Sequence, residues 1–139
     1  MLLGRYEHTV DTKGRVSVPA RFREDLGERF VITRGLDNCL ALYSLNEWAV
    51  LAEKVKALPM AQARTIQRYL FTGAYETEID AQGRMVIPQN LRTFAGITKD
   101  VVIAGLSNRA EVWDREAFDK SESSVSADDV VELMSQLGF

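Results

Sequence analysis

The sequence of 139 residues has a single cysteine, Cys39, and a single histidine, His8. One cysteine excludes an intrachain disulfide. The two residues are also too few for a Cys/His zinc site or a histidine-based catalytic triad within one chain. Paired carboxylates in a glycine-rich loop are missing as well. We therefore expect neither an enzyme nor a protein that holds a metal, a cofactor or a small-molecule substrate.

Long apolar runs are absent too. No stretch approaches the roughly 18 apolar residues of a membrane span, and Arg5 and Glu7 interrupt the apolar start too early for a signal peptide. A lone cysteine fits a reducing compartment. We expect a soluble, cytoplasmic protein with no membrane partner.

An excess of basic residues is likewise absent, because 17 Lys and Arg stand against 20 Asp and Glu and give a net charge of −3. Bulk charge therefore does not indicate a nucleic-acid partner. The charge is unevenly distributed, since residues 1–70 carry a net +3 and residues 71–139 a net −6. Any polyanion is expected to contact the first half.

What the sequence does contain is an internal duplication. Residues 6–19 match residues 75–88 at an offset of 69, with Tyr, Glu, Asp, Gly, Arg and Pro recurring in register. After one inserted residue, residues 35–43 match residues 105–113. The chain is thus predicted to be two tandem units of about 45 residues each.

Each unit is predicted to be β-rich with one short helix. In the first, strands are expected at 6–10 and 15–18, a helix between Pro19 and Gly27, and strands at 30–33 and 39–43. The second repeats the pattern at 75–79, 84–87, 88–96, 101–104 and 110–113. An Asp-x-x-Gly turn joins the first two strands of each unit and predicts a hairpin.

Longer helices are expected outside the units. Ser44 and Glu47 resemble a capping box for a helix that ends at Pro59, and a second apolar run leads from Met60 to Leu70. A polar link is predicted at 121–126, before a terminal helix that Ser126 could cap. The predicted divisions are 5–47 and 76–119 for the two units, 48–74 for a helical connector, and 120–139 for the link and terminal helix.

The most distinctive motif is Asp-x-x-Gly-Arg, at Asp11 to Arg15 and again at Asp80 to Arg84. The structural interpretation pairs each Arg with its Asp and uses Gly for its backbone freedom. The functional interpretation is that each turn presents a guanidinium to a partner. Cations surround the first motif, which has a local net charge of +3 against −1 for the second, so basic function should concentrate in unit one.

The sequence around these two motifs resembles that of the MraZ family. The resemblance rests on Gly4, on Asp-x-Lys-Gly-Arg-x-x-x-Pro at 11–19 with Arg23, on the run 34–40, and on the second motif through Arg92, and it covers residues 1 to about 120. It implies an α+β, β-rich fold of two SpoVT-AbrB-like units, with swapped hairpins and an AbrB-like β-barrel. Because a small unit of short strands cannot bury both of its faces alone, the two units are expected to pack as an intrachain pseudo-dimer with peripheral helices. The resemblance also implies a homo-oligomeric ring and binding to repeated promoter sites on double-stranded DNA.

The resemblance further implies a nucleoid-associated repressor of the protein's own promoter and of the division and cell-wall gene cluster. The family's DNA-contacting motif falls on Arg15 and Arg84, with Lys13 beside Arg15 where unit two has Gln82. The residues expected at the DNA are Arg15, Lys13, Arg84, Arg5, Arg21 and Arg23, and those expected to organise the turns are Asp11, Gly14, Asp80 and Gly83.

The alternative is a protein-interaction module of the AbrB-like antitoxin type. That function would predict a disordered C-terminal tail, whereas residues 127–137 have the apolar spacing of a compact amphipathic helix.

Overall fold

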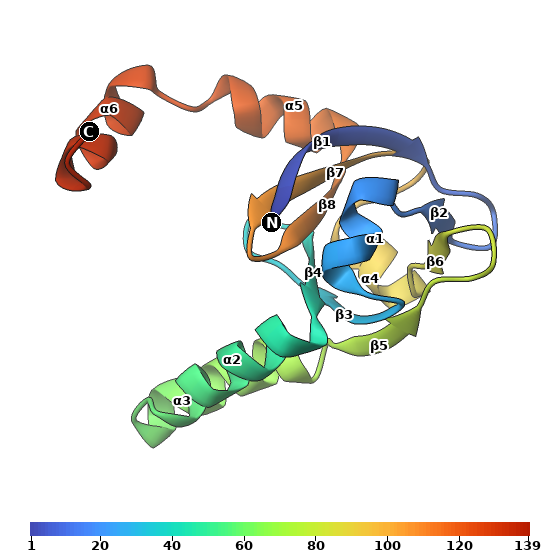
Figure 1. Ribbon diagram of the computed structural model, residues 1–139, viewed down its shortest axis with the longest axis horizontal. Helices are drawn as coiled ribbons and strands as arrows, with labels where there is room; N and C mark the ends of the chain where they lie inside the picture. Colours follow the sequence, from blue (N-terminus) through green and yellow to red (C-terminus); the bar gives the residue numbers. More distant parts are fainter.

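The computed structural model describes residues 1–139 (Figure 1). Each unit has four strands and one short helix, in the predicted order. Unit one contains β1 (Leu2–Thr9), β2 (Arg15–Ser17), α1 (Ala20–Leu26), β3 (Arg29–Arg34) and β4 (Leu40–Ser44). Unit two contains β5 (Tyr75–Glu78), β6 (Arg84–Val86), α4 (Gln89–Phe94), β7 (Asp100–Ser107) and β8 (Ala110–Asp114).

The two units exchange their strands. β1 pairs with β7 of unit two, β5 pairs with β3 of unit one, and β4 pairs with β8. The second strands, β2 and β6, pair with each other in a separate two-stranded ribbon. Every strand pair between the units is antiparallel, so the duplication is built into one interlocked structure.

The predicted hairpin between β1 and β2 is therefore correct at its tip and wrong beyond it. The Asp11 N–H donates to the Arg15 carbonyl at 2.9 Å, and the Gly14 N–H donates to the Asp11 carbonyl at 3.0 Å. Past these bonds the two arms diverge to strands of the other unit. Apolar alternation specifies which face of a strand is buried, but it does not specify the neighbouring strand.

The larger sheet has six strands in the order β1-β7-β8-β4-β3-β5. Its edge strands, β1 and β5, are not paired with one another. The AbrB-like barrel therefore stays an expectation from the resemblance, beyond the pairing seen here.

A single apolar core joins the two units. Nineteen buried residues form one cluster, and equivalent positions of the repeat contribute to it together, such as Val16 with Met85 and Phe22 with Leu91. Helices α1 and α4 lie among the strands in Figure 1 and bury Phe22 and Leu91 there. Both helices expose their remaining faces to solvent, and their apolar faces supply core that short strands cannot fill alone.

The other helices do lie at the periphery (Figure 1). α2 (Leu45–Lys56) begins at Ser44, whose hydroxyl accepts from the Glu47 N–H at 3.2 Å, as the capping pattern predicts. It is followed by α3 (Met60–Ile66) and by a π-helical turn, η1 (Gln67–Phe71). Trp48 of α2 packs against Tyr43 and Phe71, with ring centroids 5.5 and 5.1 Å apart.

The polar link expected at 121–126 is shorter than predicted. A helix, α5 (Arg115–Ser123), occupies its first half and is capped by Asp114. Phe118 anchors α5 by packing edge-on against Trp113, with the two ring centroids 5.8 Å apart. Cys39 and Val102 belong to the same buried cluster. After residues 124–126 comes α6 (Ala127–Gln136), capped by Ser126 as predicted. None of the helices is long and apolar enough to cross a membrane.

Candidate nucleic-acid interface

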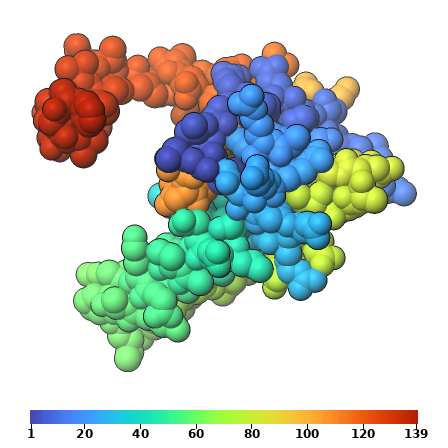
Figure 2. Space-filling model, viewed as in Figure 1, coloured from blue at the N-terminus to red at the C-terminus, as the bar shows by residue number.

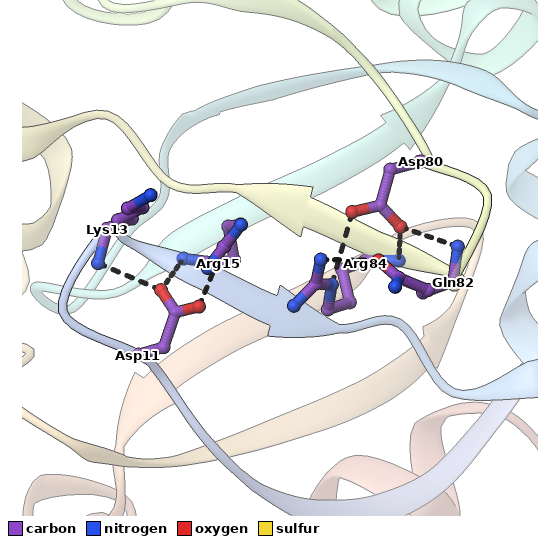
Figure 3. A network of polar contacts seen from close by, with 6 residues as sticks. All are labelled: Asp11, Lys13, Arg15, Asp80, Gln82 and Arg84. Atoms are coloured by element: carbon purple, nitrogen blue, oxygen red, sulfur yellow. Dashed lines mark hydrogen bonds and ion pairs between the residues drawn. The ribbon is translucent and has the colours of Figure 1, made fainter.

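The two Asp-x-x-Gly-Arg motifs meet on the β2–β6 ribbon. Arg15 is registered opposite Val86 and Ser17 opposite Arg84, while Val16 opposite Met85 points into the core. Because side chains alternate along a strand, Arg15 and Arg84 share the outer face of the ribbon. Figure 3 shows both arginines on this ribbon, each beside its own turn.

Asp11 organises the first turn with one carboxylate. Its Oδ1 accepts from the backbone N–H groups of Lys13 at 2.9 Å and Arg15 at 2.8 Å, and its Oδ2 accepts from Arg15 Nε at 2.7 Å (Figure 3). The bond from the Arg15 N–H is the main reason that the pKa of Asp11 falls from its ordinary 3.8 to about 2. Asp11 is therefore ionised across the physiological range.

Asp80 organises the second turn in the same way. It accepts from the backbone N–H groups of Gln82 and Arg84, both at 2.9 Å, and from Arg84 Nε at 3.1 Å. The Arg84 N–H is again the main group that lowers the pKa of this carboxyl. Both turns thus have the Asp–Arg ion pair of the structural interpretation.

The ion pair uses only one edge of each guanidinium. In unit one, no hydrogen bond engages the terminal nitrogens of Arg15, and the exposed Lys13 side chain makes no ion pair. In unit two, Gln82 takes the place of Lys13, and its Oε1 accepts from Arg84 Nη2. The first turn therefore presents two cationic groups with unused donors, whereas the second presents one guanidinium that a neutral neighbour partly satisfies.

Each turn rests on an arginine of the other unit. A Cβ added to Gly14 would lie 2.3 Å from Arg92 Nη1, and one added to Gly83 would lie 2.3 Å from the Arg23 guanidinium carbon. Both glycines also have positive φ, 82° and 76°. They are required because the backbone turns sharply at these points and the opposite guanidinium packs directly against it.

Backbone bonds reinforce this crossed arrangement. The Val18 N–H donates to the Gly83 carbonyl at 2.9 Å, while Arg23 Nε donates to the Val18 carbonyl at 3.0 Å. At the equivalent place the Ile87 N–H donates to the Gly14 carbonyl at 2.8 Å, and Arg92 Nε is buried without a hydrogen-bond partner. The sequence places Arg23 with the first turn, but the structure places it beneath the second.

The charge contrast between the turns is consequently smaller in the structure than in the sequence. Lys13, Arg15 and the underlying Arg92, against Asp11, give the first turn a net charge of +2. Arg84 and the underlying Arg23, against Asp80, give the second a net charge of +1. Unit one is still the more basic, by the Lys13-to-Gln82 difference.

Two predicted site residues lie apart from this arrangement. Arg5 packs over Phe118 of α5 with its guanidinium 4.8 Å from the ring centroid, and its ion pairs are with Glu7 and Asp119. Arg21 is exposed on α1 and makes no ion pair. Sequence reasoning missed Arg92, although the repeat offset already relates it to Arg23.

The arrangement can present cations and backbone edges, and it contains no group of His, Cys, Asp or Glu side chains that could hold a metal ion. The fold and this site define a protein of two interlocked copies of one unit, joined by a ribbon that carries two Asp–Arg turns. Residues 1–69 and residues 70–135 each match the family described as "MraZ protein, putative antitoxin-like".

Relatives match along the whole chain. It is 51% identical to the transcriptional regulator MraZ of Caldicellulosiruptor bescii, and 49% identical to proteins of the same name from Acetivibrio thermocellus and Alkaliphilus oremlandii. Each alignment covers all of both chains. The chain therefore belongs to the MraZ family. These relatives are named as regulators and not as enzymes, which confirms the expectation that the protein is not an enzyme.

Proposed function

We propose that this protein is a transcriptional regulator that binds double-stranded DNA sequence-specifically through the β2–β6 ribbon. The observation that carries the proposal is the placement of Arg15 and Arg84 on one outer face of a two-stranded ribbon, each fixed by its own aspartate. The relatives' name, transcriptional regulator, supports the same function. Such a regulator acts in the cytoplasm, at the nucleoid.

The shape of the ribbon suits this role. The major groove of B-DNA is about 12 Å wide and admits a two-stranded β-ribbon, where arginine can contact guanine edges or phosphates. The Asp–Nε bonds hold both guanidinium groups before DNA arrives, so little side-chain entropy is lost on binding. Lys13 adds a phosphate contact at the edge of the ribbon.

The proposed regulator works as a homo-oligomeric ring on repeated promoter sites, because a few cations per turn give weak binding unless several turns act together. Its proposed targets follow the family resemblance: repression of its own promoter and of the division and cell-wall gene cluster. An antitoxin-type interaction module is the second candidate, and the family description includes that term. The capped helix α6 supports the regulator over that alternative, which predicted a disordered tail.

A mobility-shift experiment on the DNA upstream of the protein's own gene tests the proposal. We expect binding that weakens steeply with salt and is lost on scrambled DNA of the same length and composition. Arg15→Ala should weaken it, and Arg64→Ala, an exposed arginine on α3 remote from the ribbon in sequence, is the matched control. Equal binding to native and scrambled DNA would contradict sequence-specific recognition.

A further inference from the structure

Helix α6 has an apolar face that nothing in the chain covers. Val130, Leu133, Met134 and Leu137 recur at helical spacing and are 45%, 62%, 42% and 72% exposed. In Figures 1 and 2 the helix stands clear of the rest of the molecule at the C-terminal end. A helix of 10 residues is marginal in water on its own, and an exposed apolar surface of this kind indicates a contact with another element.

The body of the protein offers a cleft of matching character. It has a volume of ≈ 350 Å³ and lies where α2 and η1 face strand β4 and the β7–β8 turn. Its apolar lining includes Val50 and Leu51 of α2 and Leu70 of η1. Its charged lining is Arg34, Lys54 and Arg109 together with Glu47 and Glu111, a net charge of +1. Walls that are partly apolar and carry one excess positive charge are suited to an amphipathic helix with acidic residues.

The two projecting parts of the chain are oppositely charged. The segment with α2, α3 and η1, residues 45–71, carries four basic and two acidic residues, a net +2. The segment with α5 and α6, residues 115–139, carries two basic and six acidic residues, a net −4. Asp128 and Asp129 lie in the first turn of α6, and Glu132 follows one turn later. The chain therefore holds both halves of a complementary contact.

We propose that α6 of one copy docks, apolar face first, into the α2–η1 cleft of a second copy. Leu133 and Leu137 would fill the cleft, with the acidic first turn toward Arg34 and Lys54. The contact joins two different surfaces, so each copy has one donor helix and one acceptor cleft, and successive contacts close a ring or extend a filament. This inference rests on the homo-oligomer of the proposed function and does not depend on DNA contact.

The first test compares Leu133→Asp with Ser135→Asp, which places the same charge on the opposite, polar face of α6. We expect light scattering after gel filtration to give a multiple of 15.6 kDa for the wild type and for Ser135→Asp. Leu133→Asp should fall to the mass of one chain and keep the wild-type circular dichroism spectrum, because α6 contributes nothing to the buried core of the chain. A Leu133→Asp protein with the wild-type mass would overturn the docking.

Disulfide cross-linking tests the partner directly. Copies with Leu137→Cys are mixed with differently tagged copies with Val50→Cys, and the buried Cys39 does not compete. We expect a disulfide-linked pair of unlike chains, and none when Ser135→Cys replaces Leu137→Cys. No cross-link at a retained oligomer mass would overturn the docking and leave the oligomer standing. A single-chain mass for the wild type would overturn both. A cross-link that forms only with both cysteines in one chain would show α6 in its own cleft, which also overturns the proposal.

Discussion

Asp11 shows how one side chain sets the local conformation and the position of a functional group together. Its carboxylate receives two backbone N–H groups, which shape the turn, and the Nε of Arg15, which aims the guanidinium. The structural and functional interpretations of the motif are therefore compatible. Asp11 accepts from the Nε edge of the guanidinium, and the remaining donors of Arg15 stay free for the partner that we propose, DNA.

The pKa of Asp11 predicts an acid-labile contribution to stability. Because the folded pKa, about 2, lies below the ordinary 3.8, this contribution is complete above pH 3.8 and is lost as the pH falls toward 2. Asp80 acts in the same direction. We expect the melting temperature of the wild type to fall more steeply in this window than that of Asp11→Asn, which should already melt a few degrees lower at neutral pH.

Calorimetry between pH 2 and pH 7 measures both curves. Glu53→Gln, which removes an exposed carboxylate that pairs with Lys56 on α2, is the control and should follow the wild type. Parallel curves for the wild type and Asp11→Asn would contradict the role of the ionised carboxylate in the turn.

Cys39 is a residue whose environment could be predicted from the sequence. A lone cysteine in an apolar run indicates a small buried hydrophobe, and the structure confirms it as fully buried. Burial is the main cause that raises the pKa of its thiol to about 12. The thiol therefore stays protonated and unreactive at neutral pH.

At the scale of elements, the sequence predicts which segments form strands and helices better than it predicts which strands pair with each other. The strands, short helices and capped helices follow from local alternation, Pro and Gly positions and Ser44 and Ser126, and all are present. The exchange of strands between units is not encoded locally, because any strand with the right buried face could pair. Helix α5 was missed because its apolar content is small and Phe118 alone anchors it in the core.

The π-turn η1 also has no local signal in the sequence. It is held from outside, since Arg34 donates to the Tyr69 carbonyl and Thr33 donates to the Leu70 carbonyl at 2.6 Å. Tyr69 in turn donates its hydroxyl to the Gly35 carbonyl at 2.6 Å. These bonds satisfy carbonyls of the last helical turn, which have no partner within the helix, so tertiary contacts hold this turn in place.

Arg92 and Arg23 each pack against the turn of the other unit, so each should stabilise that turn and not its own. Removing the side chain in Arg92→Ala should loosen the first turn, where Gly14 packs against it, and leave the turn of its own unit unchanged. We expect hydrogen exchange at the Gly14 and Arg15 amides to quicken by up to about tenfold, the effect of roughly 1.4 kcal/mol of lost packing. Arg23→Ala should do the same to Gly83 and Arg84.

Amide exchange measured by NMR on both variants tests the crossing. The two variants are matched controls, because each removes the same side chain from equivalent positions of the repeat. A loosened Gly83 turn in Arg92→Ala would show that each arginine acts within its own unit, contrary to the geometry.

At the scale of the whole molecule, the two units are one folding unit with two unequal turns. The core residues come from both units, so neither is expected to be stable without the other. The repeat gives both turns the same backbone and the same Asp–Arg pair. If the proposed DNA contact holds, we expect the two turns to differ in it through Lys13 in one and Gln82 in the other, multiplied by the number of copies in the proposed oligomer.

Because several copies would bind together, Arg15→Ala and Arg84→Ala should have large effects on DNA binding in protein that keeps the oligomer mass. Each phosphate contact removed should reduce the slope of log K against log salt by about 0.9. A loss of only ~1 kcal/mol of binding free energy per turn should lower the apparent affinity by orders of magnitude when several copies bind together. Arg15→Ala should lose more affinity and more slope than Arg84→Ala, whose guanidinium Gln82 already partly satisfies.

Two further variants locate the cause of that difference. Lys13→Gln makes the first turn like the second, and Gln82→Lys makes the second like the first, so they should move the salt slope in opposite directions. The measurement is binding to the promoter DNA across salt concentrations, with the mass of each variant checked beforehand, since a dissociated oligomer loses affinity for a separate reason. If Arg84→Ala costs as much affinity and slope as Arg15→Ala, the two turns contact DNA equivalently, and the Lys13-to-Gln82 difference has no part in recognition.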